Sequence, residues 1–583
     1  MTEPGGRGAS GEASGGRGAP DEASGGRGAP GEASGGRVAP GEAGRVSRPV
    51  EHGTTDVLVV GGGVAGLVAA LECAKVGLRV TLLERRESIG GCVGRIELDG
   101  LSLDSGAESF ATRGGAVAEL LESLGLADDI EKPNPAGAWL VWPASGGRLD
   151  AAPLPRTGVL GIPANPLGDD VRRIIGWNGA VRAYADRLMP ILTIGRAHSL
   201  GNLVRKRMGD AVLDRLVTPI SAGVYSSDPD DLDLDVVAPG LNEAMTRAGS
   251  LSGGVGQLIE ERRAGSAVLG LRGGMQRLVD ALAGQLERFG VEVLTGAEVT
   301  GLERLAPPGG ADDSRAEEAE GRPSRTPGAH PDAPRWRVSA AVAAISAPDA
   351  TGEVTVAGEP VEASEPRELR LDAPYVVVAA PAEASRRLLD EAALGWSDAA
   401  DWPSAASVEL VTLVFDAPAL DAAPRGTGVL VAAGTPGVTA KALTHSTAKW
   451  SWLAELAQGR HVVRLSYGRA GEANPLDGRT DDEVAALALA DAGALLGTPL
   501  DASMLRASGR SAWRDALSQA TIGQRDRVRA LEDVLAAEPG IEATGSWVAG
   551  TGLASVVPHA LEAARRIRHL AVSTDEVAGG TAE

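Results

Sequence analysis

Three glycines near the start of the predicted folded region have the spacing of a phosphate-binding turn. Gly61, Gly63 and Gly66 form G-x-G-x-x-G between an apolar run, VLVV, and a helical pattern, LVAALECAKVG. This is the context that a dinucleotide-binding motif requires, and it places a pyrophosphate at the positive end of a helix dipole. Residues 57–84 therefore predict a Rossmann-like βαβ unit. The turn consists of Gly61, Gly62, Gly63, Val64, Ala65 and Gly66.

A carboxylate follows this turn at the distance expected for a ribose contact. Glu84 ends the second apolar strand, about 20 residues after the glycines, where it can accept hydrogen bonds from an adenosine ribose. It would repel a 2′-phosphate, which disfavours NADP. The alternative, a glycine-rich turn with no ligand, is disfavoured because strand, helix, second strand and terminal Glu occur together. The motif itself leaves FAD and NAD open.

Further segments carry a family resemblance. They include ERRESIGGCVGR (84–95), DGLSLDSGAESFATR (99–113), VTPISAGVYSSDPDDLDL (217–234), LRGGMQRLVDAL (271–282), APYVVVAAPAEASRRLL (373–389), AWRDALSQATIGQRDRV (512–528) and GTGLASVVPHA (550–560). In order and spacing they resemble the flavin-dependent amine oxidase and protoporphyrinogen oxidase superfamily, with the bacterial coproporphyrinogen III oxidase group as the nearest match. The chain departs from the family pattern at Ser88 and Cys92, where arginines are common. Ala138 stands where eukaryotic protoporphyrinogen oxidases have an arginine, which supports the bacterial group.

The resemblance implies a noncovalently bound FAD. Gly90 and Gly91 would cross its pyrophosphate, the turn at 106–109 would approach the isoalloxazine, and the C-terminal glycine turn would meet the flavin from the side opposite the adenine. Beyond the first turn, the FAD contacts carried over from the family are Glu84, Arg85, Gly91, Cys92, Arg95, Gly106, Ala107, Glu108, Ser109, Val299, Trp513, Gly550, Leu553, Ala554 and Ser555.

The implied reaction is the six-electron oxidation of coproporphyrinogen III to coproporphyrin III in heme biosynthesis, with O2 as acceptor and H2O2 as product. Arg113 is the candidate ligand for a substrate propionate, and Tyr225 could line the pocket or pack the helical region. We assign no catalytic residue, because the histidines, His198, His445, His461 and His559 among them, are scattered and lack a catalytic spacing.

Several other functions stay open at this point. The chain could act on protoporphyrinogen IX, or be an amine oxidase or carotenoid desaturase of the same superfamily. A flavoprotein that binds a tetrapyrrole without oxidising it is a third possibility. Transient contact with other heme-pathway enzymes is possible, and the sequence leaves the oligomeric state undecided.

The composition of the chain argues against several classes of ligand and partner. The 583 residues carry a formal charge of −22, which argues against nucleic-acid binding. Two cysteines are too few for a disulfide framework or a Cys-rich metal site, so we expect no metal and a reducing cytoplasm. The sequence contains no apolar run long enough to cross a membrane.

The pattern of strands and helices that must position these residues predicts a mixed α/β fold with a parallel sheet. We expect a discontinuous FAD-binding domain, a mixed-sheet substrate domain and an inserted helical module. We predict a disordered repeat tail (1–53), FAD-binding parts (54–133, 271–395 and 511–575), a helical module (134–225), substrate-domain parts (226–270 and 396–510), a disordered insertion (306–334) and a C-terminal tail (576–583).

Overall fold

The computed structural model describes most of the chain after residue 49. The described ranges are 50–156, 158–189, 196–261, 268–306, 335–343, 367–392, 395–397, 402–403, 406–517 and 520–579. All of them belong to one compact unit, Pro49–Glu583. The predicted repeat tail up to residue 49 and the predicted insertion after Ala306 lie outside the described residues.

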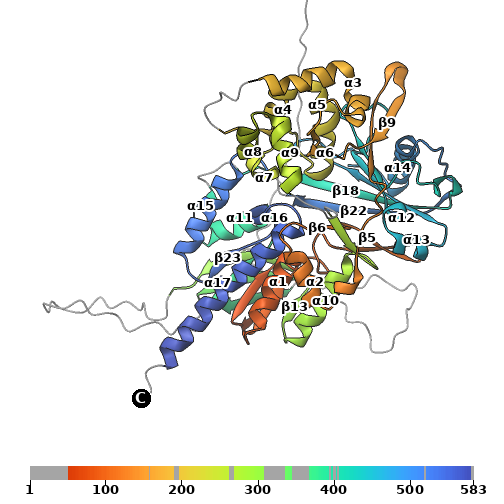
Figure 1. The fold of residues 1–583 in the computed structure, drawn as a ribbon. Helices are drawn as coiled ribbons and strands as arrows, with labels where there is room; N and C mark the ends of the chain where they lie inside the picture. Colours follow the sequence, from red (N-terminus) through yellow and green to blue (C-terminus); the bar gives the residue numbers. More distant parts are fainter. Residues whose placement is uncertain are drawn as a thin grey trace, which may run out of the picture. The chain divides into compact units, whose positions relative to one another are not determined.

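A five-stranded parallel sheet carries the predicted dinucleotide-binding unit (Figure 1). Four of its strands are buried at every position, as expected for a parallel sheet covered on both faces. Segments far apart in the sequence meet here, which confirms the predicted mixed α/β class. In spatial order the strands are β13 (Glu292–Leu294), β3 (Val80–Leu83), β2 (Val57–Val60), β17 (Tyr375–Val378) and β23 (Ile541–Ala543).

Different layers cover the two faces of this sheet. Val57 and Val59 pack against helices on one face, while Leu58 and Val60 pack against a second sheet on the other. The helical layer contains α1 (Val64–Ala74), α2 (Ala116–Ser123), α10 (Gln276–Arg288) and α17 (Leu553–Gly579). The second layer contains β14 (Ala297–Arg304), β15 (Trp336–Val342), β16 (Arg367–Ala373), α11 (Ala382–Glu391) and α15 (Gln524–Ala537). Helices α1 and α17 lie side by side, so segments near the two ends of the sequence pack together (Figure 1).

The predicted start of the fold needs a correction. Residues 50–53, which we expected in the tail, belong to strand β1 (Val50–Thr54), which pairs in parallel with β16. The sequence VEHGT has little strand signal of its own. Its extended conformation depends on hydrogen bonds to β16, more than 300 residues away, which local patterns cannot reveal.

A seven-stranded mixed sheet forms the second large element (Figure 1). Helix α14 (Asp481–Leu496) packs against one face of it, where Leu413, Val463 and Leu465 lie. In spatial order the strands are β22 (Leu505–Leu517), β18 (Ala406–Phe415), β21 (His461–Tyr467), β20 (Ala442–His445), β19 (Gly428–Val431), β8 (Ala138–Pro143) and β9 (Leu149–Pro153).

The helical region begins and ends later than predicted. We expected residues 134–225 to be helical, but β8 and β9 join the seven-stranded sheet. The helices continue instead through Glu261, into the range predicted as substrate domain, and share one apolar core. Strand β8 was assigned to the helical module because its partner β19 is almost 300 residues away. The helices are α3 (Asp169–Tyr184), α4 (Leu200–Met208), α5 (Asp210–Val212), α6 (Thr218–Val224), α7 (Leu234–Val237), α8 (Leu241–Ala248) and α9 (Leu251–Glu261).

Short elements connect these layers. They are β4 (Arg95–Leu98), β5 (Leu101–Asp104), β6 (Phe110–Ala111), β7 (Ile130–Glu131), β12 (Val268–Leu271), α12 (Ser446–Lys449), α13 (Ser451–Ala457) and α16 (Ser546–Ala549). The predicted C-terminal tail also starts too early, because α17 runs to Gly579. Among the described helices, none combines the length and apolar character that crossing a bilayer requires.

Candidate functional site

The glycine turn after β2 has no room for side chains. Gly61 has φ of 107°, and a Cβ atom there would lie 2.7 Å from the carbonyl oxygen of Ala379. A Cβ atom on Gly66 would lie 1.9 Å from the carbonyl oxygen of Gly61. The turn therefore requires glycine at both positions and keeps its backbone close to the start of α1.

Glu84 holds this turn from the end of β3. Its Oε2 accepts a hydrogen bond from the Gly62 backbone nitrogen at 2.7 Å, and its Oε1 accepts one from the Arg86 backbone nitrogen at 2.8 Å. The carboxylate thus lies at the end of the strand, beside the glycine turn. This is the place where a ribose-binding acid is expected in a dinucleotide fold.

The second glycine pair lies directly on the first turn. Gly90 donates a backbone hydrogen bond to the Gly62 oxygen at 2.7 Å, and it forms a parallel bridge with Gly63. A Cβ atom on Gly91 would lie 3.0 Å from the Gly63 Cα atom. The backbones of the two segments therefore lie in direct contact. Such a cradle beside a helix N-terminus fits the pyrophosphate of a dinucleotide.

Next along the chain, Cys92 and Gly94 pack against the turn at 105–107. Cys92 accepts a backbone hydrogen bond from Ala107 at 2.8 Å, and a Cβ atom on Gly106 would lie 2.0 Å from the Cys92 oxygen. Trp513 on β22 donates from its indole nitrogen to the Ser105 oxygen at 2.8 Å. Trp513 is thus in direct contact with the start of this turn, although more than 400 residues separate them. Both Trp513 and the turn at 106–109 are predicted to contact the flavin.

Glu108 is the centre of a buried ionic cluster. Its carboxylate pairs with Lys449 and with Arg464, the latter at 3.2 Å, and only 9% of its side chain is exposed. Burial alone would raise the pKa of Glu108, but the Arg464 and Lys449 cations outweigh it and hold the pKa at about 2. Arg464 also donates to the Gly106 oxygen at 2.8 Å. The cluster joins the turn at 106–109 to the seven-stranded sheet.

The C-terminal glycine turn meets the same region from the other end of the chain. Gly550 and Gly552 have φ of 93° and 97°, and α17 begins at Leu553. Ser555, in the first turn of α17, accepts a hydrogen bond from Arg113 at 2.9 Å. Two predicted site residues from opposite ends of the sequence are therefore partners.

The other predicted site residues are not part of the contacts described above. Arg85 lies 3.9 Å from Glu298 in an exposed ion pair, and Arg95 pairs with Asp280 at 2.7 Å, also exposed. Val299 is buried in β14, and Tyr225 packs against the core of the helical region. Ser109 and Ala554 are half-buried, and Leu553 is buried. Their roles as FAD or substrate contacts stay predictions.

Sequence reasoning missed the residues that hold the turn at 106–109. Asp104 accepts a hydrogen bond from the Met275 nitrogen at 2.8 Å, and burial raises its pKa to about 7, against the opposing effect of Arg464. The sequence could have indicated the role of Arg464, because this residue is one charge within the apolar strand HVVRLSY. An arginine in such a strand is usually paired. The sequence around Lys449 gives no indication of its role, because the position of Lys449 depends on the packing of α12.

Comparison with known proteins agrees with this geometry. The family model described as flavin containing amine oxidoreductase matches residues 64–323 and 333–567. The chain belongs to this family. The resemblance inferred from the sequence is confirmed, and the protein is an oxidoreductase of a flavin-dependent family, with a flavin as its cofactor.

Curated relatives match along most of their length. A coproporphyrinogen III oxidase from Propionibacterium freudenreichii is 26% identical over 545 residues, covering 88% of this chain and 90% of the relative. The coproporphyrinogen III oxidase of Mycobacterium tuberculosis is 29% identical over 504 residues, covering 86% and 94%.

Solved structures support the fold. A crystal structure from Exiguobacterium sp. 255-15 has a TM-score of 0.65 at 24% identity and covers 91% of this chain and all of its own. A putrescine oxidase has a TM-score of 0.53 at 17% identity and covers 90% of this chain and all of its own. These likenesses show that the chain shares its fold with the two proteins.

Proposed function

We propose that this protein oxidises coproporphyrinogen III to coproporphyrin III, using noncovalently bound FAD and O2. The observation that carries the proposal is the match to curated coproporphyrinogen III oxidases over 86–88% of this chain and 90–95% of theirs, for the relatives from Propionibacterium, Bacillus and Mycobacterium. The family match includes Gly66, the second glycine pair and the C-terminal turn.

The residues present fit a dinucleotide flavin. The backbone cradle of Gly61–Gly66 with Gly90 and Gly91 would hold the pyrophosphate, and Glu84 would bind the adenosine ribose. The turn at 106–109 and Trp513 would face the isoalloxazine on one side, with Gly550–Ser555 on the other. The two cysteines, Cys73 and Cys92, both lie in the N-terminal part of the fold, so the C-terminal turn has no thiol for a covalent tether.

When bound, FAD would accept two electrons at a time, so a six-electron oxidation needs three rounds. The protein's own contribution would be to orient the substrate and exclude water. Arg113 is exposed beside Ser555, where its guanidinium can bind a substrate propionate through two hydrogen bonds. The N-terminus of α17 would stabilise negative charge at this place.

Protoporphyrinogen IX is the second candidate substrate. The plant protoporphyrinogen oxidase 1 of Arabidopsis thaliana is 27% identical, but the match covers only 43% of this chain and 48% of that protein. The long matches to coproporphyrinogen III oxidases from three bacterial genera are what favours the coproporphyrinogen assignment.

Aerobic turnover of both porphyrinogens, side by side, tests the proposal. We expect porphyrin fluorescence to rise faster with coproporphyrinogen III, with three peroxides formed per porphyrin, because each two-electron reoxidation by O2 yields one. A faster reaction with protoporphyrinogen IX would move the assignment to the second candidate. Oxidation of an amine without porphyrin formation from either substrate would overturn both.

A further inference from the structure

One face of the seven-stranded sheet is directed towards the turn at 106–109, which is predicted to approach the flavin. Arg464 on β21 donates from this face to the Gly106 oxygen at 2.8 Å. Because successive side chains of a strand point to opposite faces, Ser466 shares this face with Arg464. The intervening Leu465 belongs to the core on the other face, where α14 packs.

The side chains beside Ser466 on this face are uncharged. Ser466 is in register with Leu410 on β18 and with Ala442 on β20. Ser511 on β22 is in register with Leu410 in turn. All four side chains are half-buried. We call the surface formed by Leu410, Ala442, Ser466 and Ser511 the site face. It is suited to the apolar pyrrole rings of a porphyrinogen but offers no cation for the propionates.

Helix α6 contacts the sheet on the β19 side of the site face. Leu430 on β19 is in register with Ala442. A Cβ atom on Gly223 of α6 would lie 2.7 Å from the Leu430 Cδ2 atom. Tyr225, which the sequence predicts as a substrate residue, follows directly after α6. The turn at 225–226 therefore lies where the helical region meets the sheet.

A buried lysine holds this turn. Lys441 is 2% exposed, and its Nζ donates to the Ser226 hydroxyl at 2.5 Å and to the Gly468 carbonyl oxygen at 2.6 Å. Ser226 has φ of 55°, a conformation that residues other than glycine rarely adopt. The Ala470 nitrogen donates to the Ser226 oxygen at 2.8 Å. The turn is thus fixed by the residues on both sides of Arg469.

Arg469 has a charge without a counterion. Its side chain is half-buried, and its Nε atom is buried with no hydrogen-bond partner among the described residues. It forms no ion pair with a described carboxylate, and its terminal nitrogens reach solvent, where a ligand can contact them. Burial lowers the pKa of Lys441 to about 7, and the positive charge of Arg469 is the second cause, so the two cations are close together.

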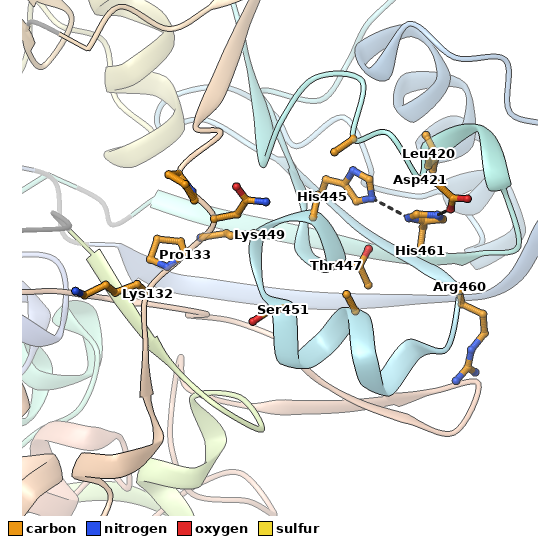
Figure 2. Close-up of a pocket in the computed structure, with 16 residues that line it drawn as sticks. Lys132, Pro133, Leu420, Asp421, His445, Thr447, Lys449, Ser451, Arg460 and His461 are labelled. Carbon is orange, nitrogen blue, oxygen red and sulfur yellow. Dashed lines mark hydrogen bonds and ion pairs between the residues drawn. The ribbon is translucent and has the colours of Figure 1, made fainter.

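Other basic side chains of this sheet and its helices already have acidic partners. Figure 2 shows three of them at the wall of a cavity of about 740 Å³. The pairs are Lys449–Glu108, Arg460–Asp99 and His461–Asp421. A half-buried arginine is usually paired as well, so an anionic ligand would supply the partner that Arg469 lacks.

We propose that Arg469 binds a propionate of the substrate, across the site face from Arg113, and that this contact makes the protein prefer a porphyrinogen with four propionates to one with two. The inference rests on the proposed oxidation of a porphyrinogen. Coproporphyrinogen III carries four propionates, whereas protoporphyrinogen IX has vinyl groups in place of two of them. The planar guanidinium of Arg469 would bind one of the two additional carboxylates through two hydrogen bonds.

Steady-state kinetics of the full-length, flavin-loaded protein with both porphyrinogens tests this proposal. Arg469→Gln should raise KM for coproporphyrinogen III about tenfold, the loss expected for one charge-assisted contact. It should leave kcat unchanged, because the contact is equally strong before and during the reaction. KM for protoporphyrinogen IX should change much less. Binding of the product coproporphyrin III, followed by porphyrin fluorescence, gives the same comparison without turnover.

Two further variants serve as controls. Arg469→Lys keeps the charge but loses the fork of donors, so it should recover part of the affinity for coproporphyrinogen III. Arg288→Gln makes the same change of charge at an exposed position, the last residue of α10, and should alter neither KM. An unchanged flavin spectrum and melting temperature would show that each variant is folded. If Arg469→Gln does not fold, the KM values of Arg469→Lys decide the question.

The outcomes separate this inference from the proposed function. If the wild-type protein oxidises neither porphyrinogen, the proposed function is wrong and this inference falls with it. If coproporphyrinogen III is oxidised, equal KM values in Arg469→Gln and Arg288→Gln would overturn this inference alone. An equal loss of affinity for both porphyrinogens would overturn the selectivity assigned to Arg469.

Discussion

At the scale of single residues, the protein uses one buried carboxylate to hold its predicted flavin turn. Glu108 compensates two cations, Arg464 on β21 of the seven-stranded sheet and Lys449 on α12. Removing one partner of a buried ion pair leaves the other charges uncompensated in a medium that solvates them poorly. Glu108 is therefore a structural requirement of the site, whatever contact it makes with a flavin.

The first prediction concerns this carboxylate. Glu108→Gln should lower the free energy of unfolding by about 3 kcal/mol, as measured by chemical denaturation. Glu298→Gln is the matched control, since Glu298 also faces an arginine, at 3.9 Å, but is exposed. It should cost less than about 1 kcal/mol.

The effect of Glu108 should depend on pH. Its folded-state pKa of about 2 is below the ordinary value of 4.5, so its stabilisation is complete above about pH 4.5 and is lost as the pH falls towards 2. The difference between wild type and Glu108→Gln should therefore shrink in acid. A difference that stays constant down to about pH 3 would contradict the assigned ion pairs.

At the scale of elements, the turn before α17 carries the most specific expectation. Gly552 has φ of 97°, and a Cβ atom there would meet no neighbour within 4 Å. Gly552→Trp and Gly552→Ala share the backbone strain, but only the tryptophan fills the space beside the turn. We expect the Trp variant to lose bound flavin and the Ala variant to keep most of it, as measured by flavin absorbance per protein. Equal flavin content in the two variants would mean that this turn does not face the cofactor.

Elements with strong local patterns could be predicted from the sequence, and those defined by distant partners could not. The run VLVV with its glycine turn and helix predicts β2 and α1 because burial, spacing and turn chemistry agree locally. Strand β1 was assigned to the tail and β8 to the helical module, since each pairs with a strand about 300 residues away. The same limit applies to the site. The glycine cradle could be predicted from the sequence. The pairs Glu108–Lys449 and Asp421–His461 could not, because they form only through tertiary packing.

At the scale of the whole molecule, the fold should begin at β1. Deleting residues 1–48 should leave the melting temperature and turnover unchanged, because the deleted decapeptide repeats are too poor in apolar residues to build a core. Deleting residues 1–54 also removes β1, which leaves β16 as an exposed edge and uncovers Leu371. We expect a lower melting temperature for this longer deletion, as measured by calorimetry. Equal melting temperatures would show that β1 contributes nothing to the fold.

The central claim is that one site, assembled from the glycine cradle near the N-terminal end and the turn near the C-terminal end, oxidises a porphyrinogen through a bound flavin. Anaerobic mixing of the purified protein with coproporphyrinogen III tests it most directly, with the visible absorbance of the flavin as the readout. We predict that the flavin absorbance bleaches within a single turnover and returns when air is admitted, while porphyrin fluorescence appears. A flavin that stays oxidised in the presence of the substrate would contradict the account.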